Sequence, residues 1–369
     1  MRRKRVLHLS TAHSAYDPRI VRKQCPALAD RYEVWCALPH ADPSVAPGVR
    51  FIRLPRFRRV LWRLLISSPY LLLRAAWLRP AIVHVYMPDL LPLAFVLRVL
   101  GCRIVYEVQE NLRRKLAIKR INRGRLLRWG YRWLDAAARR HFHLIFTEHA
   151  YLETYRTLTH TAAVVYNYPD LPFYEPFRNR PAIPTDLVYV GGISFERAID
   201  TLITALALLH QTHPATRLHL FGPVYFPEKE LEGIPGYAAV RNHLTFYGYT
   251  DQAAALPVVA RAAAGLALLK PVGDYPESYP TKVFEYMALG VPVITSAFPL
   301  YQDVVERPGG GFCIDPTDAR TLADRLRFLL DHPAEAQQMG QRGRRAVQRH
   351  FTWETERRKL LDFYQHILL

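Results

Sequence analysis

The chain has 369 residues, of which 50% are hydrophobic and 12% aromatic. This length exceeds the usual size of one hydrophobic core, and the composition is too apolar for a disordered chain, so we expect two folded domains. The net charge of +18 is uneven: residues 1–170 hold 30 lysines and arginines against 11 acidic residues, and residues 171–369 hold 20 against 21. The basic character belongs to the first half alone.

The four cysteines form no C-x-x-C pair, and no charged and then apolar leader with a cleavage site opens the chain. We therefore expect a cytoplasmic protein whose cysteines act as small buried hydrophobic residues. The longest apolar stretch, residues 60–78, is interrupted by Arg63, Pro69 and Arg74. These interruptions argue against a membrane-spanning helix.

The first half alternates short apolar runs with stretches of helical spacing. Residues 6–10 form such a run and are followed by a loop and by a helical pattern over residues 21–29, as at the start of a doubly wound parallel sheet. Further strands, or strand ends, are expected at residues 32–37, 82–86, 103–108, 145–148 and 164–170. Polar residues that follow such strands line the ligand crevice of a parallel sheet.

The second half repeats this alternation after a break. Residues 171–186 are rich in proline and lack periodic apolar positions, which predicts a linker. Strands are then expected at residues 187–190, 217–221, 244–249, 265–269 and 293–295. The Gly191-Gly192 pair after the first of them lets backbone approach a ligand closely, although ordinary tight turns use the same pair.

The basic residues of the first half gather in three runs, at residues 2–5, 53–79 and 113–140, with tryptophans among them. Arginines beside aromatic and leucine-rich faces favour contact with a membrane surface or with an anionic lipid-linked molecule. A solvated basic face is the simpler alternative, and a nucleic-acid groove is another. The chain has no helix-turn-helix, zinc-finger or RNP-type pattern, so we expect no nucleic-acid partner.

Residues 277–295 carry the most informative pattern of the chain. Glu277 precedes a predicted helix and Glu285 lies inside it, with Pro280 suited to the first helical position and Gly290 to its end. The unpaired N–H groups and the dipole of such a helix start attract a phosphate. A short β-branched run follows, so the segment is expected to form a loop, a helix and a strand of an α/β domain.

Together with the surrounding Tyr-Pro-Thr-Lys and Glu-Tyr-Met-Ala-x-Gly-x-Pro-Val context, these residues resemble the E-x7-E motif of retaining glycosyltransferases of family 4. The resemblance implies the α/β GT-B fold, with two Rossmann-like doubly wound domains facing a central cleft and a C-terminal helix that crosses back to the first domain. It places an N-terminal acceptor-binding domain at residues 1–170, the linker at 171–186, a nucleotide-sugar-binding domain at 187–350 and the returning helix at 351–369.

The resemblance assigns the sugar donor to the second domain. By this carry-over Glu285 binds the ribose hydroxyls, Glu277 contacts hydroxyls of the transferred sugar, and Arg197 neutralises the diphosphate; these three are the catalytic candidates. We expect Lys282 or Lys270 to share the diphosphate charge, although either lysine could instead be an exposed residue. The expected donor-binding residues are Gly191, Gly192, Arg197, Tyr247, Gly248, Lys270, Tyr279, Pro280, Thr281, Lys282 and Glu285.

The acceptor is expected at the first domain, where the candidates are His13, Arg19, Asp89, Gln109 and Glu110. Arg19 would face the cleft, or else form an ion pair with Asp17. Gln109 stands where the family's subgroup usually has a histidine, and an amide can orient a hydroxyl but cannot act as a general base. The acceptor-side chemistry therefore departs from the family pattern.

The resemblance implies a retaining, metal-independent transferase that moves a hexose or related sugar from a nucleotide-diphosphate sugar to a glycan or lipid-linked saccharide. No cofactor and no metal are expected, since the chain lacks an Asp-x-Asp motif. The expected location is the cytoplasm, at the inner face of the cell membrane. Two alternatives stay open: a nucleotide-sugar epimerase of the same fold, and a binding protein that has kept the fold without catalysis.

Overall fold

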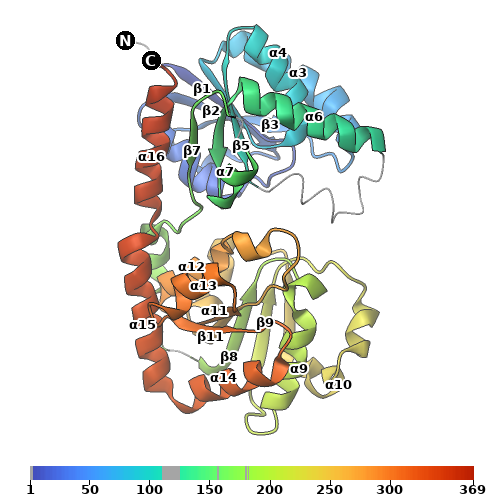
Figure 1. Ribbon diagram of the computed structural model, residues 1–369, viewed down its shortest axis with the longest axis vertical. Helices are drawn as coiled ribbons and strands as arrows, with labels where there is room; N and C mark the ends of the chain where they lie inside the picture. Colours follow the sequence, from blue (N-terminus) through green and yellow to red (C-terminus); the bar gives the residue numbers. More distant parts are fainter. Residues whose placement is uncertain (1–2, 110–124, 156–157, 179–180, 182) are drawn as a thin grey trace. The chain divides into compact units, whose positions relative to one another are not determined.

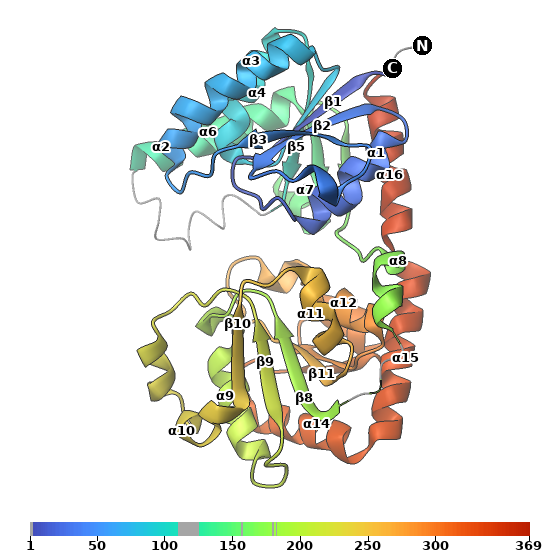
Figure 2. The same ribbon diagram turned by 180° about the vertical axis from the view of Figure 1, so that it is seen from behind.

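The computed structural model describes residues 3–109, 125–155, 158–178, 181 and 183–369. The chain divides into two compact units: residues 1–167 together with residues 353–369, and residues 168–352. Each unit is a parallel β-sheet with helices packed on both faces (Figures 1 and 2). This arrangement confirms the two doubly wound α/β domains expected from the sequence.

The first unit contains a parallel sheet of seven strands in the order β3-β2-β1-β4-β5-β6-β7. The strand bounds are Arg5–Leu9 for β1, Glu33–Pro39 for β2, Arg50–Leu54 for β3, Ile82–Val85 for β4, Arg103–Val108 for β5, His143–Phe146 for β6 and Ala162–Val164 for β7. The order changes direction between β1 and β4, and ligands of open parallel sheets bind beside the carboxyl ends of the strands at such a point.

Alternate side chains of these strands enter different cores, because successive residues of a strand point to opposite faces. Val6 and Ile82 pack with α1 (Cys25–Ala29) and α16 (Trp353–His366), whereas Leu7 and Val83 pack with α3 (Ser68–Leu78), α4 (Leu91–Val99) and α6 (Arg125–His141). Both faces are therefore covered, which explains why the strands read as continuous apolar runs. The other helical segments are η1 (Pro18–Gln24), η2 (Pro43–Val45), α2 (Val60–Trp62), η3 (Arg63–Ser67), η4 (Pro88–Leu90) and α7 (Ala150–Thr154).

The second unit repeats the same order over six parallel strands, β10-β9-β8-β11-β12-β13. The strand bounds are Ile183–Val190 for β8, Arg217–Phe221 for β9, Leu244–Gly248 for β10, Ala262–Ala267 for β11, Val293–Ser296 for β12 and Gly311–Ile314 for β13. Here the order changes direction between β8 and β11, so the loops after these two strands are the expected ligand positions.

Helices α9 (Ile199–Leu209) and α14 (Ala319–Asp331) pack together in the main core of this unit, and α12 (Thr281–Leu289) packs on α15 (Pro333–His350). The α12–α15 contact depends on glycine, because a Cβ at Gly340 would lie 1.8 Å from the carbonyl oxygen of Gly290. The remaining helical segments are α8 (Leu171–Tyr174), η5 (Glu175–Phe177), η6 (Phe195–Arg197), η7 (Glu228–Gly233), α10 (Tyr237–Val240), η8 (Arg241–His243), α11 (Gln252–Val259), η9 (Tyr275–Glu277), α13 (Pro299–Tyr301) and η10 (Gln302–Glu306).

Helix α16 returns to the first unit after the chain has completed the second, as the sequence predicted. Its residues Trp353, Leu360 and Tyr364 are buried in the core beside β1 and β4. The Tyr364 hydroxyl lies 2.6 Å from His84 Nδ1, and Glu356 accepts a hydrogen bond from the backbone N–H of Tyr166 at 2.8 Å. The helix is thus joined to the first sheet by polar contacts as well as by apolar packing.

Three local features differ from the expectations. Strands β3 and β13 were not predicted, and residues 171–186, the predicted proline-rich linker, contain α8, η5 and the first part of β8. Pro280 lies immediately before α12 and not at its first position, a difference of one residue that is common at helix ends. Within the described residues, no helix is both long enough and apolar enough to cross a membrane.

Candidate functional site

The loop after β8 places the Gly191-Gly192 pair at the carboxyl edge of the second sheet. Gly191 has φ 124, a backbone region that favours glycine. Its N–H donates to the Phe221 carbonyl at 2.8 Å, so the residue offers a ligand space rather than an amide donor. Gly192 is required by Tyr225, because a Cβ there would lie 2.4 Å from the ring. Tyr225 itself is exposed.

Two cationic side chains converge on Gly191. A Cβ built on this residue would lie 3.2 Å from Lys282 Nζ and 3.3 Å from Arg197 Nη1. Arg197 ends the short helix η6 after β8, and Lys282 belongs to the first turn of α12. Two separate elements therefore bring positive charge to one glycine, where the missing side chain leaves room for an anion.

The Lys282 ammonium is buried without a compensating acceptor. Its side chain is 7% exposed, and Nζ makes no hydrogen bond to any residue that the structure describes. The nitrogen lies 3.8 Å from the centre of the Tyr189 ring, whose π-face gives partial compensation. Burial lowers the pKa of Lys282 well below its usual value, and the nearby Arg197 charge lowers it further, while the Glu285 carboxylate offsets part of the shift. A bound anion would favour the charged form of Lys282 beside Arg197.

The structure distinguishes Lys282 from Lys270, which the sequence could not. Lys270 Nζ forms an ion pair with Asp200 at 2.7 Å, and its backbone N–H donates to the Glu196 carbonyl. Its charge is already neutralised, so Lys282 is the lysine with an unsatisfied charge. The pairing depends on a residue 70 positions away in the chain.

The two glutamates of the motif differ in surroundings. Glu285 is half-buried in α12 and accepts a hydrogen bond from Gln252 Nε2 at 2.9 Å, while the same amide donates to the Tyr174 hydroxyl. Gly290 follows the last residue of the helix with φ 77, as predicted. Residues 279–282 lie at the start of α12, where the helix dipole favours negative charge.

Glu277 is exposed at the end of η9, on the loop between β11 and α12. The buried Tyr301 holds this loop, because its hydroxyl contacts the carbonyl oxygens of Tyr275 at 2.7 Å and of Ser278 at 2.9 Å. These two carbonyls flank Glu277 in the chain. Tyr301 therefore fixes the backbone on both sides of that carboxylate, a role that no sequence signal indicated.

Tyr247, expected beside a nucleobase, stacks on Phe221 with ring centres 4.1 Å apart. Its hydroxyl lies 3.0 Å from His219 Nδ1, and its side chain is 42% exposed. Gly248 adopts φ 65 and accepts a hydrogen bond from the Gly222 N–H. The exposed part of the Tyr247 ring is still accessible for stacking on a ligand.

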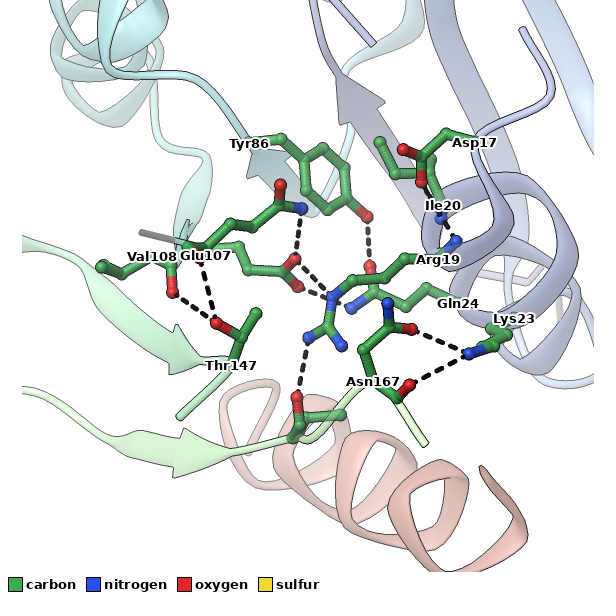
Figure 3. A network of polar contacts seen from close by, with 12 residues as sticks. Asp17, Arg19, Ile20, Lys23, Gln24, Tyr86, Glu107, Val108, Thr147 and Asn167 are labelled. Atoms are coloured by element: carbon green, nitrogen blue, oxygen red, sulfur yellow. Dashed lines mark hydrogen bonds and ion pairs between the residues drawn. The ribbon is translucent and has the colours of Figure 1, made fainter. Parts of the chain in front are cut away.

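In the first unit Arg19 is buried and faces neither solvent nor Asp17 (Figure 3). Its Nε donates to Glu107 at 2.8 Å and its Nη2 donates to the Val165 carbonyl at 2.8 Å. Asp17 instead accepts hydrogen bonds from backbone N–H groups at the start of η1. Arg19 thus pairs with a carboxylate from β5 and not with Asp17 of the neighbouring loop. Its expected contact with a donor phosphate or an anionic acceptor stays a prediction.

Glu107 is the centre of this polar network. Besides Arg19 it accepts hydrogen bonds from Gln24 at 2.6 Å and from Gln109 at 2.8 Å. Burial alone would raise the pKa of Glu107, but the Arg19 charge and a contact with His84 hold it well below its usual value. Burial lowers the pKa of His84, and the neighbouring Glu107 carboxylate partly opposes this shift.

Gln109 connects Glu107 to His13, at the carboxyl edge of the sheet, through hydrogen bonds to both side chains. Because the Gln109 amide nitrogen faces the Glu107 carboxylate, its oxygen faces His13 Nε2 at 3.0 Å. The imidazole must then donate from Nε2. The other ring nitrogen of His13 lies 2.7 Å from the Ser10 hydroxyl. Both nitrogens are engaged, so the pair forms a fixed polar edge and not a free base.

Asp89 lies after β4 at the same edge and is 5% exposed. It accepts a hydrogen bond from the Thr11 hydroxyl at 2.8 Å, and Arg63 Nη1 lies 3.6 Å from the same carboxylate oxygen. Glu110, the fifth acceptor candidate, lies outside the described residues. Among the residues that are described, no group of three or more His, Cys, Asp or Glu side chains could hold a metal ion.

Comparison with known proteins agrees with this geometry. Residues 174–346 match the family model described as glycosyl transferases group 1. A glycogen synthase of Mycobacterium tuberculosis is 28% identical over 172 residues, which are 47% of this chain and 40% of that protein. The chain thus matches less than half of the length of this curated relative.

Solved structures resemble the whole chain. A sucrose-phosphate synthase from Thermosynechococcus elongatus is 21% identical, with a TM-score of 0.77 over 99% of both chains. The Anabaena protein Alr3699/HepE in complex with UDP-glucose is 16% identical, with a TM-score of 0.73 over 98% of this chain and 100% of that one. The family match identifies residues 174–346 as a group 1 glycosyl transferase domain, and the whole chain has the GT-B fold of these solved structures.

Proposed function

We propose that the protein transfers a sugar from a nucleotide-diphosphate sugar to a glycan or lipid-linked saccharide, with retention of configuration at the anomeric carbon. The observation that carries the proposal is the unpartnered, buried Lys282 ammonium beside Arg197 at Gly191. A diphosphate would supply the negative charge that this pair lacks. The UDP-glucose complex of the similar Anabaena protein supports a nucleotide sugar as the ligand.

In this proposal the donor lies along the carboxyl edge of the second sheet. Lys282 and Arg197 hold the diphosphate, together with backbone N–H groups at the start of α12. Glu285 accepts from the ribose hydroxyls and Glu277 from hydroxyls of the sugar, since a carboxylate matches a vicinal diol. Tyr247 and Gly248 are the candidates for the base.

The proposed reaction breaks the bond between the anomeric carbon and the diphosphate oxygen and forms a bond between that carbon and an acceptor hydroxyl oxygen on the same face. The departing diphosphate accepts the hydroxyl proton, so no separate base is needed. Negative charge grows on the diphosphate as the bond breaks, and fixed cations aimed at it lower the barrier. Gln109 and His13, both already hydrogen-bonded, fit a role in orienting the acceptor.

The test is a calorimetric screen of UDP, GDP, ADP, dTDP and their sugars with the wild type and Glu285→Gln. One nucleotide should bind selectively and should bind at least about tenfold more weakly to the variant, because a ribose contact to a carboxylate is lost. Binding of no nucleotide would overturn the proposal. Incubation with the donor alone separates the alternatives, since an epimerase changes the sugar without an acceptor.

Tyr301→Phe tests the loop that carries Glu277. The variant loses the hydroxyl that contacts the carbonyls of Tyr275 and Ser278, so kcat is expected to fall by about tenfold or more while affinity for the free nucleotide diphosphate changes by less than about threefold. Steady-state kinetics and calorimetry measure the two effects. Tyr155→Phe is the control, because it removes a buried phenol hydrogen bond of 2.7 Å in the first unit. An equal fall of kcat in the two variants would contradict a specific role of Tyr301 in positioning Glu277.

For the acceptor and the location we propose a saccharide, free or lipid-linked, bound beside His13, Asp89 and Gln109 at the inner face of the cell membrane. The excess of positive charge in residues 1–170 supports an anionic surface or an anionic acceptor as the partner of this unit. Single hydrogen bonds decide which sugar is transferred and which linkage is formed. Product analysis with a series of saccharide acceptors identifies both.

A further inference from the structure

Residues 60–78 form one continuous helical segment, built from α2, η3 and α3 (Figure 2). Several of its apolar side chains are exposed to solvent. Leu71, Ala75 and Leu78 of this segment are buried in the core of the first unit. Large apolar side chains at spacings of three or four residues emerge on the outer side, which places them next to one another along the helix. These residues, the outer face, are Leu61, Trp62, Leu65, Ile66, Tyr70, Leu73 and Trp77, exposed by 41–71%.

An outer face of this kind is unusual for a water-soluble surface. Single exposed apolar residues need no explanation, but a contiguous group of them on one helix marks an interaction site. The two most exposed members are Leu73 at 71% and Trp77 at 67%, and most of their apolar surface meets water in the isolated chain even though the Trp77 ring contacts Trp35 and Arg74. A partner that covers them would recover this free energy.

The charge around the outer face identifies the partner. Residues 43–88 contain eight arginines and no aspartate or glutamate. Four of these arginines are exposed and precede or follow the helical segment closely in the chain: Arg56, Arg58, Arg59 and Arg79. A surface that combines an apolar ridge, tryptophans and unopposed arginines is complementary to a bilayer with anionic headgroups, which accepts all three.

We propose that the outer face of residues 60–78 docks the protein on an anionic lipid bilayer. The apolar side chains enter the boundary between headgroups and acyl chains, and the flanking arginines contact the lipid phosphates. The neighbouring helix α6 also exposes Trp129, Arg132 and Trp133. A second copy of the chain is a poorer occupant, because it would bring the same set of arginines against itself.

The inner side of the same helical segment points to the acceptor edge of the first sheet. Arg63 of η3 is largely buried and approaches Asp89 after β4, and its Nε makes no hydrogen bond to any described residue. The segment therefore joins the proposed membrane face to the carboxyl edge where the acceptor candidates lie. The link between the membrane face and the acceptor rests on the proposed function, and it makes a lipid-linked saccharide the favoured acceptor.

Flotation with vesicles tests the surface without any need for activity. The wild type should float with vesicles that contain phosphatidylglycerol at low salt, and less with pure phosphatidylcholine. Leu65→Ser/Leu73→Ser should reduce partitioning by about tenfold or more, and Arg58→Gln/Arg59→Gln by about fivefold or more. The control Arg345→Gln/Arg349→Gln removes two exposed charges from α15 of the second unit and should leave partitioning unchanged.

Several results would overturn the proposal: no flotation of the wild type at low salt, full binding by Leu65→Ser/Leu73→Ser, or an equal loss in the control. A dimer that this variant dissociates in sedimentation equilibrium would assign the face to a second copy instead. The altered leucines are exposed, so melting temperatures should match the wild type. Nucleotide binding, measured on each variant without lipid, reports on the donor site separately, so failure of one proposal is distinguishable from failure of the other.

Discussion

Lys282→Met is expected to weaken donor binding by roughly 30- to 1,000-fold, which corresponds to about 2–4 kcal/mol for a buried charged contact. The variant keeps a side chain of similar length but loses the ammonium that lies beside Arg197 at Gly191. The wild-type lysine has no hydrogen-bond acceptor among the described residues. The Lys282 ammonium would therefore gain its first hydrogen-bond acceptor when the donor diphosphate binds.

The same substitution should make the ligand-free protein more stable, by on the order of 1 kcal/mol. Burial holds the pKa of Lys282 well below its usual 10.5, so the unfolded chain binds this proton more tightly than the folded protein does. The stability of the wild type therefore rises as the pH increases through the folded-state pKa. A residue that destabilises the free protein but strengthens ligand binding is retained for function and not for folding.

Donor affinity should also depend on pH. A bound diphosphate favours the charged ammonium, so above the pKa of the free site binding must take up a proton and the affinity falls as the pH rises. Calorimetry in buffers of different ionisation enthalpy measures the proton uptake, and Lys282→Met should abolish it. Lys229→Met, which removes an exposed lysine of the same unit, is the control. Unchanged donor binding in Lys282→Met would exclude the proposed diphosphate site.

Glu107→Gln is expected to destabilise the protein by about 3–5 kcal/mol, because it leaves the buried Arg19 guanidinium without its counter-charge. Arg19 is 4% exposed and donates to Glu107 at 2.8 Å. Glutamine keeps the size of the side chain, but its amide group would face donors from Gln24 and Gln109. The loss of charge and the clash of donors act in the same direction.

Acid sensitivity provides the second readout of this network. The folded-state pKa of Glu107 lies well below its usual 4.5, so its contribution is fully present above the unfolded-state pKa and is lost as the pH falls toward the folded-state value. Denaturant unfolding from neutral pH down to acidic pH should show a steeper loss of stability in the wild type than in Glu107→Gln.

The surface ion pair between Arg357 and Asp30 is the control for the buried pair between Arg19 and Glu107. Arg357 and Asp30 approach within 2.6 Å but are substantially exposed, so Asp30→Asn should cost less than about 1 kcal/mol. The double variant Arg19→Met/Glu107→Gln should recover part of the loss, because it removes the uncompensated guanidinium as well. If Glu107→Gln is no more harmful than Asp30→Asn, the charge pairing is not what stabilises this part of the core.

Most of the fold could be predicted from the chain because the signal is local. Strands buried on both faces are continuous apolar runs, and β1, β5 and β9 stand within a residue of the predicted positions. β3 lies at the edge of its sheet and contains two arginines among its five residues, and β13 has only four residues and follows a glycine pair. Neither offers the continuous apolar run on which the prediction depends.

The site was predictable where one motif contains it and not where distant residues meet. The positions of Glu277, Glu285 and Gly290 follow from helix start and stop signals within a single segment. The choice between Lys282 and Lys270 depends on Asp200, and the partner of Arg19 lies 88 residues away in β5. No periodicity encodes such pairings, and only an alignment or a structure could have revealed them.

Helix α16 belongs to the first unit but is synthesised after the whole second unit. The ribosome delivers all seven strands of that unit, and then the whole second unit, before residues 353–369 appear. Until then His84 and the backbone N–H of Tyr166 lack the partners that α16 supplies. The second unit can therefore complete its core during translation, while the core of the first lacks Trp353 and Tyr364 until residues 353–369 have been made. In the growing chain, the half that is made first is the half that finishes folding last.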